Sequence, residues 1–217
     1  MKIVVFGSTG RVGSSFTAKA AAAGHQVVAF ARRADMVKVE GVHPFQGDVR
    51  DHDAVRTALS QGCDAVVCCI GEAGLKPSTI VTDAFTSIID AMTGLGLKRF
   101  LAVSGSAEMK QMTMAGKIYT AILKRTPVGH AIRDHDGGLK VVQQSSLEWT
   151  LAGCNYLSDG PERGTGIGSH SSFLAGSRRS TLQMSPRFYS KRQKFPPFEM
   201  RSLESGINPH SATRTCP

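Results

Sequence analysis

The clearest structural signal in the chain lies at residues 2–13, Lys2-Ile3-Val4-Val5-Phe6-Gly7-Ser8-Thr9-Gly10-Arg11-Val12-Gly13. Its first five residues are mostly apolar and β-branched, a composition that favours a buried strand. An Ala-rich segment at 14–23 follows the glycines and predicts a helix, and the apolar run 27–30 predicts a second strand. A glycine-rich turn between a strand and a helix is typical of the first βαβ unit of a dinucleotide-binding fold.

The three glycines of this turn each have a physical role in such a unit. Gly7 lets the chain turn sharply, Gly10 lets the backbone approach a pyrophosphate, and Gly13 lets the helix lie close to the sheet. The pyrophosphate would bind the free N–H groups at the helix N-terminus, where the helix dipole also favours an anion. The predicted site comprises Gly7, Ser8, Thr9, Gly10, Arg11, Val12 and Gly13, with Ser8, Thr9 and Arg11 as possible side-chain donors. The alternative is a tight turn with a purely structural role.

The rest of the chain continues to alternate between strands and helices. Apolar runs predict further strands at 42–49, 64–70, 98–103 and 147–151. Spacing and composition predict helices at 51–59, 78–95, 115–124 and 134–145, although Gly137 and Gly138 weaken the last of them. The pattern predicts an α/β fold, a Rossmann-like doubly wound parallel sheet with strand order 3-2-1-4-5-6.

The C-terminal part of the chain has a different character. We predict an NAD(P)-binding domain over 1–164, followed by a basic segment of low regularity, 165–217, as an irregular C-terminal extension. Ser, Arg, Pro and Gly are frequent there and apolar periodicity is lost. The segment is a disordered extension, an irregular lobe, or a stretch unlike a normal fold terminus, and the composition favours disorder or loose packing.

Charge and cysteine content limit the class of protein. The net charge is +9, but residues 169–217 hold eight Lys and Arg against two Glu, so the predicted domain is close to neutral. We therefore expect no nucleic-acid partner. No apolar run is long enough for a membrane span and no signal-peptide pattern begins the chain, so we expect a cytoplasmic protein without a membrane partner. Its five cysteines show no disulfide spacing.

Several enzyme classes lack their motifs in this chain. No His, Cys or carboxylate cluster has the spacing of a metal site, so no metal is expected. The sequence also lacks a G-x-S-x-G elbow, and no P-loop lysine follows the glycines. Kinase, hydrolase and metalloenzyme functions are therefore not predicted.

With these elements in place, the chain resembles the atypical short-chain dehydrogenases, and within them the NAD(P)H-binding group that includes flavin reductase and biliverdin reductase B. The stretches that carry the resemblance are 7–13, 31–33, 47–49, 67–71, 102–106, 134–135, 147–150 and 159–161. The resemblance implies a reductase with a nicotinamide cofactor. In such relatives Asp48 and Val49 would border the adenine, Ile70 and Gly71 the ribose and phosphate, and Ser104 the nicotinamide. The chain departs from the family at residues 152–153, where Ala-Gly replaces the usual Arg-Pro pair.

The end of the second predicted strand indicates which cofactor is used. A site for NAD usually places a carboxylate there, to bind the ribose 2′-hydroxyl. This chain has Arg32 and Arg33 instead, and no carboxylate before Asp35. A guanidinium pairs well with a 2′-phosphate, so the cofactor is predicted to be NADP(H), with Arg32 as the main contact.

The usual proton donor of short-chain dehydrogenases is missing. Tyr119 and Lys124 are the nearest match to a Tyr-x-x-x-Lys pair, but at five residues apart their side chains diverge around a helix. The catalytic candidates are Ser104, His135 and Tyr156. Hydride transfer to a flavin or quinone needs little acid–base help from the protein, so the missing pair is compatible with such acceptors.

Three functions remain open at this point. The first is an NADPH-dependent oxidoreductase that transfers hydride to a flavin-like or quinone-like acceptor, acting on a small molecule as a monomer or homodimer. The second is a non-catalytic NADP(H)-binding sensor or regulatory protein. The third, disfavoured by the short chain, is an epimerase- or dehydratase-like enzyme on the same fold.

Overall fold

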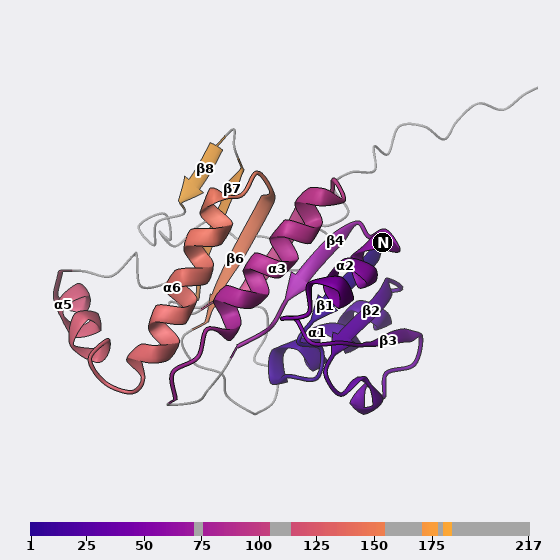
Figure 1. Ribbon diagram of the computed structural model, residues 1–217, viewed down its shortest axis with the longest axis horizontal. Helices are drawn as coiled ribbons and strands as arrows, with labels where there is room; N and C mark the ends of the chain where they lie inside the picture. Colours follow the sequence, from indigo (N-terminus) through magenta and orange to yellow (C-terminus); the bar gives the residue numbers. More distant parts are fainter. Residues whose placement is uncertain (72–75, 105–113, 155–170, 178–179, 184–217) are drawn as a thin grey trace, which may run out of the picture.

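The computed structural model describes residues 1–71, 76–104, 114–154, 171–177 and 180–183. Figure 1 shows a central sheet with helices on its faces. The strands are β1 (Lys2–Phe6), β2 (Gln26–Ala31), β3 (Val42–Gln46), β4 (Ala65–Cys68), β5 (Arg99–Val103), β6 (Glu148–Cys154), β7 (Ser171–Ser177) and β8 (Ser180–Gln183). The helices are α1 (Arg11–Ala22), the short 3₁₀ turn η1 (Ala34–Met36), α2 (His52–Ser60), α3 (Ile80–Gly94), α5 (Met114–Leu123) and α6 (Gly129–Gln144).

The sheet has the order β3-β2-β1-β4-β5-β6-β7-β8. Its first six strands are parallel, which confirms the predicted doubly wound sheet and the order 3-2-1-4-5-6. Val4 of β1 pairs with Val28 on one side and Val66 on the other, so β1 lies between β2 and β4. The carboxyl ends of β1, β2 and β4 therefore meet at one edge, where α1 begins.

The sheet continues beyond the six predicted strands. Strands β7 and β8 are antiparallel, and β7 pairs with the edge strand β6 along its length. No regular element was predicted after residue 164, so β7 and β8 are an addition to the predicted fold. The division of the chain at residue 164 stays a prediction.

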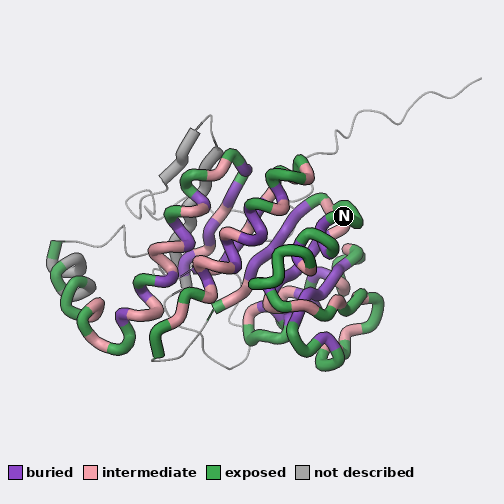
Figure 2. Tube along the Cα trace, viewed as in Figure 1, coloured by how far each residue is buried: buried purple, intermediate pink, exposed green. Residues whose placement is uncertain are grey.

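The core lies on both faces of the sheet. Helices α2, α3 and α6 cover one face, where the largest cluster of buried side chains includes Leu59, Phe85 and Leu139. Helix α1 covers the other face through Ala20 and Phe16. Figure 2 shows β1, β2 and β4 mostly buried and the outer helix faces exposed.

Helix α6 begins five residues earlier than predicted. Two glycines near its centre, Gly137 and Gly138, face α3. A Cβ on Gly137 would lie 2.4 Å from Thr82 Oγ1 on α3, and one on Gly138 would lie 3.0 Å from the Phe85 ring. These glycines let α6 approach α3 closely, so their low helix propensity is offset by packing.

Helix α5 stands at the side of the molecule, next to the start of α6 (Figure 1). The side chains of Met114, Ile118 and Ile122 on it are exposed. Among the described residues, the structure contains no helix that combines the length and the apolar character of a membrane span.

Candidate functional site

The glycine-rich turn after β1 has the geometry that its sequence predicts. Gly7 has a φ of +75°, a conformation that side chains disfavour, and a Cβ there would lie 3.0 Å from the Cys69 backbone. Gly10 N donates to Gly7 O at 3.0 Å and closes the turn. A Cβ on Gly13 would lie 2.1 Å from Gly7 O, so the first turn of α1 rests directly on the strand end.

Helix α1 begins without a side-chain cap, unlike α2. Within the described residues, no side chain caps α1 and its first turn holds no acidic residue. At α2, by contrast, Asp51 accepts hydrogen bonds from the backbone nitrogens of Asp53 and Ala54. An uncapped helix start beside a glycine-rich turn is suited to bind an external anion such as a pyrophosphate.

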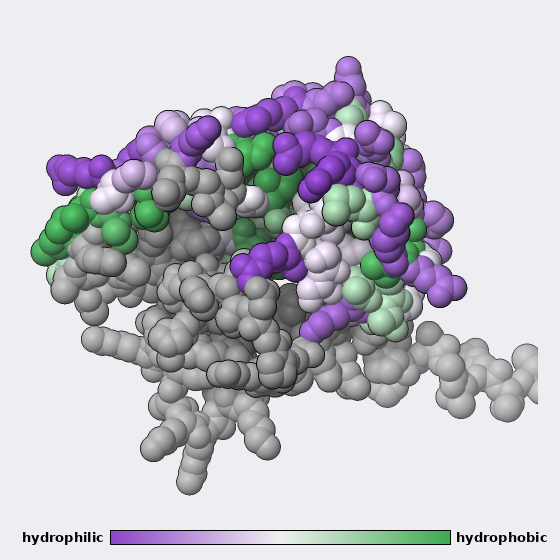
Figure 3. All heavy atoms as spheres, turned by 90° about the horizontal axis from the view of Figure 1, so that it is seen from below, coloured by the Kyte–Doolittle hydropathy of each residue, from purple (hydrophilic) through white to green (hydrophobic). Residues whose placement is uncertain are grey.

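A cavity of about 890 Å³ runs from this turn across the carboxyl edge of the sheet. Figure 3 views the molecule from the side on which α3 and α6 begin, and shows hydrophilic side chains around a hollow with apolar residues inside it. The lining comprises Gly7, Thr9, Gly10, residues 30–33, 47–50, 69–71 and 76–80, Thr82, His130, Arg133 and Asp134. Such a volume suits a ligand larger than a single nucleotide base.

Nine of the predicted cofactor residues line this cavity: Gly7, Thr9, Gly10, Arg32, Arg33, Asp48, Val49, Ile70 and Gly71. The other predicted residues of the turn lie beside it. Ser8 is 2 % exposed, and its hydroxyl donates to the Phe30 carbonyl at 3.2 Å. The backbone nitrogen of Ser8 donates to the same carbonyl at 3.5 Å, so Ser8 ties the turn to β2. Arg11, Val12, Gly13 and Ser104 are absent from the lining.

The end of β2 places two arginines on the cavity wall. Arg32 and Arg33 are both exposed and follow Ala31, the last residue of the strand. Asp35 is in η1 and is not among the described lining residues. This end of the cavity is therefore cationic, which suits a phosphate group better than an uncharged hydroxyl.

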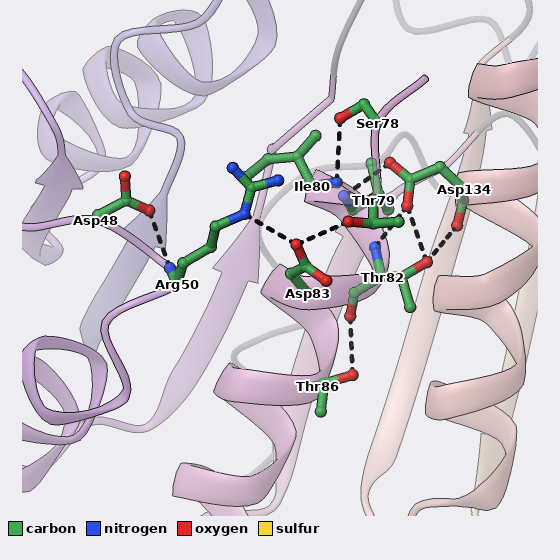
Figure 4. A network of polar contacts seen from close by, with 10 residues as sticks. Asp48, Arg50, Ser78, Thr79, Ile80, Thr82, Asp83, Thr86 and Asp134 are labelled. Atoms are coloured by element: carbon green, nitrogen blue, oxygen red, sulfur yellow. Dashed lines mark hydrogen bonds and ion pairs between the residues drawn. The ribbon is translucent and has the colours of Figure 1, made fainter.

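A polar network crosses the cavity between the end of β3 and the start of α3 (Figure 4). Asp48 Oδ1 accepts from the backbone nitrogen of Arg50, and Arg50 Nε lies 2.9 Å from Asp83 Oδ2. Thr79 Oγ1 donates to the same Asp83 oxygen at 3.0 Å. Arg50 was not among the residues predicted from the sequence. Its position two residues after Asp48 could have indicated that it lies at the same site.

Asp134 belongs to one of the stretches that carry the family resemblance, and in the structure it has a specific structural role. It is 6 % exposed, and its carboxylate accepts from the backbone nitrogens of Val81 at 2.9 Å and Thr82 at 2.8 Å. Thr82 Oγ1 lies 2.8 Å from Asp134 Oδ1 (Figure 4). Asp134 on α6 therefore caps the N-terminus of α3.

Two of the predicted catalytic residues meet at the end of β5. Ser104 Oγ lies 3.2 Å from His135 Nδ1, although the residues are 31 positions apart. Ser104 is 1 % exposed, and its backbone nitrogen donates to the Ala152 carbonyl of β6. Burial lowers the pKa of His135, against the opposing effect of Asp134 and Asp136. The ring is therefore neutral at pH 7 and acts as a hydrogen-bond partner of Ser104.

The remaining catalytic candidate, Tyr156, lies outside the described residues, and so does the side chain of Tyr119. Lys124 is described: its Nζ forms an ion pair with Asp136 at 2.6 Å. That partner supports the prediction that Lys124 is not half of a Tyr-Lys proton donor. No group of three metal-ligating side chains occurs in the described part of the chain.

Comparison with known proteins gives a consistent result. Residues 7–182 match a protein family described as NAD(P)H-binding. A short-chain dehydrogenase/reductase from Veillonella parvula in complex with NADP is 15 % identical, with a TM-score of 0.60 over 74 % of this chain and 72 % of that one. An oxidoreductase from Lactococcus lactis is 23 % identical, with a TM-score of 0.61 over 76 % and 73 %. The anaerobillin reductase ChuY from Escherichia coli is 22 % identical, with a TM-score of 0.60 over 76 % and 78 %. At these identities the likeness shows a shared fold.

Proposed function

Because the chain belongs to the NAD(P)H-binding family, we propose that it is an NADPH-dependent reductase that passes a hydride to a flavin-like or quinone-like acceptor. The family match and the similar structures agree with the resemblance to the atypical short-chain dehydrogenases. The ChuY neighbour is a reductase, which favours reduction as the direction of the reaction. The acceptor class rests on the chemistry of the site.

One observation carries the cofactor assignment. The uncapped N-terminus of α1 and the two arginines after β2 border the same cavity. The backbone of the turn would bind the pyrophosphate, and Arg32, assisted by Arg33, would bind the 2′-phosphate. Asp48 and Val49 would border the adenine, and Ile70 and Gly71 the ribose next to the pyrophosphate. This arrangement favours NADPH over NADH.

The pair of Ser104 and His135 would serve the nicotinamide end. Bound NADPH would supply a hydride, and uptake of one proton would complete the two-electron reduction of the acceptor. We propose that the Ser104 hydroxyl orients the carboxamide or the acceptor, and that His135 holds that hydroxyl in place. Tyr156 remains a candidate to contact the acceptor. An aromatic acceptor tolerates this modest set of acid–base groups.

The experiment is calorimetric titration of the purified protein with NADPH and NADH, followed by steady-state NADPH oxidation with FMN, riboflavin and a quinone. Arg32→Ala is expected to weaken NADPH binding roughly 10- to 100-fold, the range of a lost charge-assisted hydrogen bond, and to change NADH binding little. Arg56→Ala, an exposed arginine on α2 away from the cavity, is the matched control. Equal binding of both coenzymes, unchanged in Arg32→Ala, would contradict the assignment.

The second candidate is a non-catalytic sensor of NADP(H). Lys124, the nearest match to the lysine of a Tyr-x-x-x-Lys proton donor, forms an ion pair with Asp136. The missing proton donor is compatible with a protein that binds NADP(H) without turnover. Tight NADPH binding without oxidation by any of the three acceptors would support the sensor over the reductase.

A further inference from the structure

The cavity has a second cationic end, distant in sequence from Arg32 and Arg33. Lys76, ahead of α3, and His130 and Arg133, in the first turns of α6, all line it. We propose that these three side chains form an anion subsite for an acidic group, a phosphate or a carboxylate, on the acceptor. The inference rests on the proposed function and specifies the acceptor class.

The guanidinium of Arg133 is held in a defined orientation. Its Nη1 donates to the Lys124 carbonyl and its Nη2 donates to His130 Nδ1 at 2.8 Å. Arginine has no acceptor atom, so Nδ1 of His130 must accept, and a neutral ring then carries its proton on Nε2. His130 is thereby left with one outward donor beside the guanidinium.

The positive charge at this end is not cancelled by a carboxylate partner. Among the described residues, neither Lys76 nor Arg133 forms an ion pair. Asp134, the adjacent carboxylate, is directed to the backbone nitrogens of α3, and its charge faces the positive end of that helix. Two unpaired cations and an N–H donor on one cavity wall favour an anionic ligand.

The cofactor does not account for this subsite. Its pyrophosphate is assigned to the N-terminus of α1 and its 2′-phosphate to the end of β2, which leaves no phosphate group for the start of α6. The cavity continues past the cofactor half to Arg133, so a second ligand would reach these cations. A reducible ring at the nicotinamide that carried an acidic substituent would place that substituent here.

FMN and riboflavin provide the test, because they share one ring system and differ by a single phosphate. The wild-type protein is expected to favour FMN in kcat/KM with NADPH. Arg133→Gln and Lys76→Gln are each expected to lower the FMN-to-riboflavin ratio roughly tenfold, the effect of one lost charge-assisted contact in a solvated site. Lys140→Gln, an exposed lysine on the same helix but outside the cavity, is the control and should leave the ratio unchanged.

Binding of FMN and riboflavin to protein saturated with NADP⁺ is measured in parallel, since it does not require turnover. A wild-type preference for FMN that both variants reduce supports the subsite even when no hydride is transferred. Equal binding of the two flavins, no binding of either, or a ratio unaffected by both variants would overturn it. A matching loss of NADPH affinity in both variants would also overturn it, because the cations would then serve the cofactor. Reduction of FMN and riboflavin at equal rates would leave the proposed reductase intact and refute the subsite alone.

Discussion

The carboxylate of Asp134 on α6 caps the first turn of α3, with its Oδ1 2.8 Å from the backbone nitrogen of Thr82. This contact joins two helices that begin at the same edge of the sheet. Because His135 follows Asp134 directly, the cap also sets the position from which His135 reaches Ser104. Stability and site geometry therefore depend on one buried carboxylate.

Removal of this cap should destabilise the fold. Asp134→Ala leaves the nitrogens of Val81 and Thr82 without their acceptor in a buried setting. We expect the free energy of unfolding to fall by about 1–3 kcal/mol in urea denaturation. Asp90→Ala, at an exposed position on α3, is the control and should change it by less than about 0.5 kcal/mol. Equal effects of the two substitutions would contradict the assigned cap.

Two glycine-to-alanine substitutions should have opposite effects. In Gly137→Ala the new Cβ would lie 2.4 Å from Thr82 Oγ1, so either Thr82 rotates and loses its contact with Asp134 or α6 and α3 separate. We expect a loss of about 1–3 kcal/mol in the free energy of unfolding, despite the better helix propensity of alanine. Gly94→Ala, at the end of α3, has open space around its Cβ and should stabilise the protein by up to about 1 kcal/mol. Thermal unfolding of both variants decides the matter, and stabilisation by Gly137→Ala would show that the helices are not in close contact.

Within the glycine-rich turn, position 13 should be less tolerant than position 10. A Cβ on Gly13 would lie 2.1 Å from Gly7 O, a backbone atom that cannot move without the turn. At Gly10 the same oxygen would be 3.2 Å away, so a small shift suffices. We expect Gly13→Ala to lower the unfolding midpoint strongly, while Gly10→Ala folds normally and weakens NADPH binding at least about tenfold by obstructing the pyrophosphate. Normal NADPH binding by folded Gly10→Ala would contradict the close approach of the backbone.

The stability of the protein should fall as the pH drops below about 6.5, partly because of His135. Burial lowers the pKa of this ring in the folded state, so the unfolded chain binds a proton that the folded state excludes. The contribution of the buried neutral ring is complete above the unfolded pKa and is lost as the pH falls toward the folded pKa. Urea denaturation at several pH values should show a shallower acid-side slope for His135→Gln than for wild type. An acid-side slope that His135→Gln leaves unchanged would contradict this role of the buried ring.

The six parallel strands and the glycine turn could be predicted because they depend on local pattern. Residues 2–13 contain both the apolar run and the glycines, so the first βαβ unit needs no distant partner to be recognised. The helix predicted at 51–59 also came from a local pattern, and in the structure Asp51 caps its start. Strands β7 and β8 lacked such a pattern, because their pairing depends on the edge that β6 offers.

The second half of the site depended on packing between distant segments. Nothing local indicated that Ser104 and His135 meet, that Asp134 caps a helix some fifty residues earlier in the chain, or that Arg133 and Lys76 share a wall. Each of these relationships follows from the close approach of α6 to α3, which Gly137 and Gly138 permit. Local sequence was enough to predict the sheet order and the geometry of the glycine-rich turn, since hydrophobic period and backbone freedom are properties of short stretches. The contacts that Asp134 and His135 make with distant segments could not be predicted in this way, because they form only when α6 docks in the folded protein.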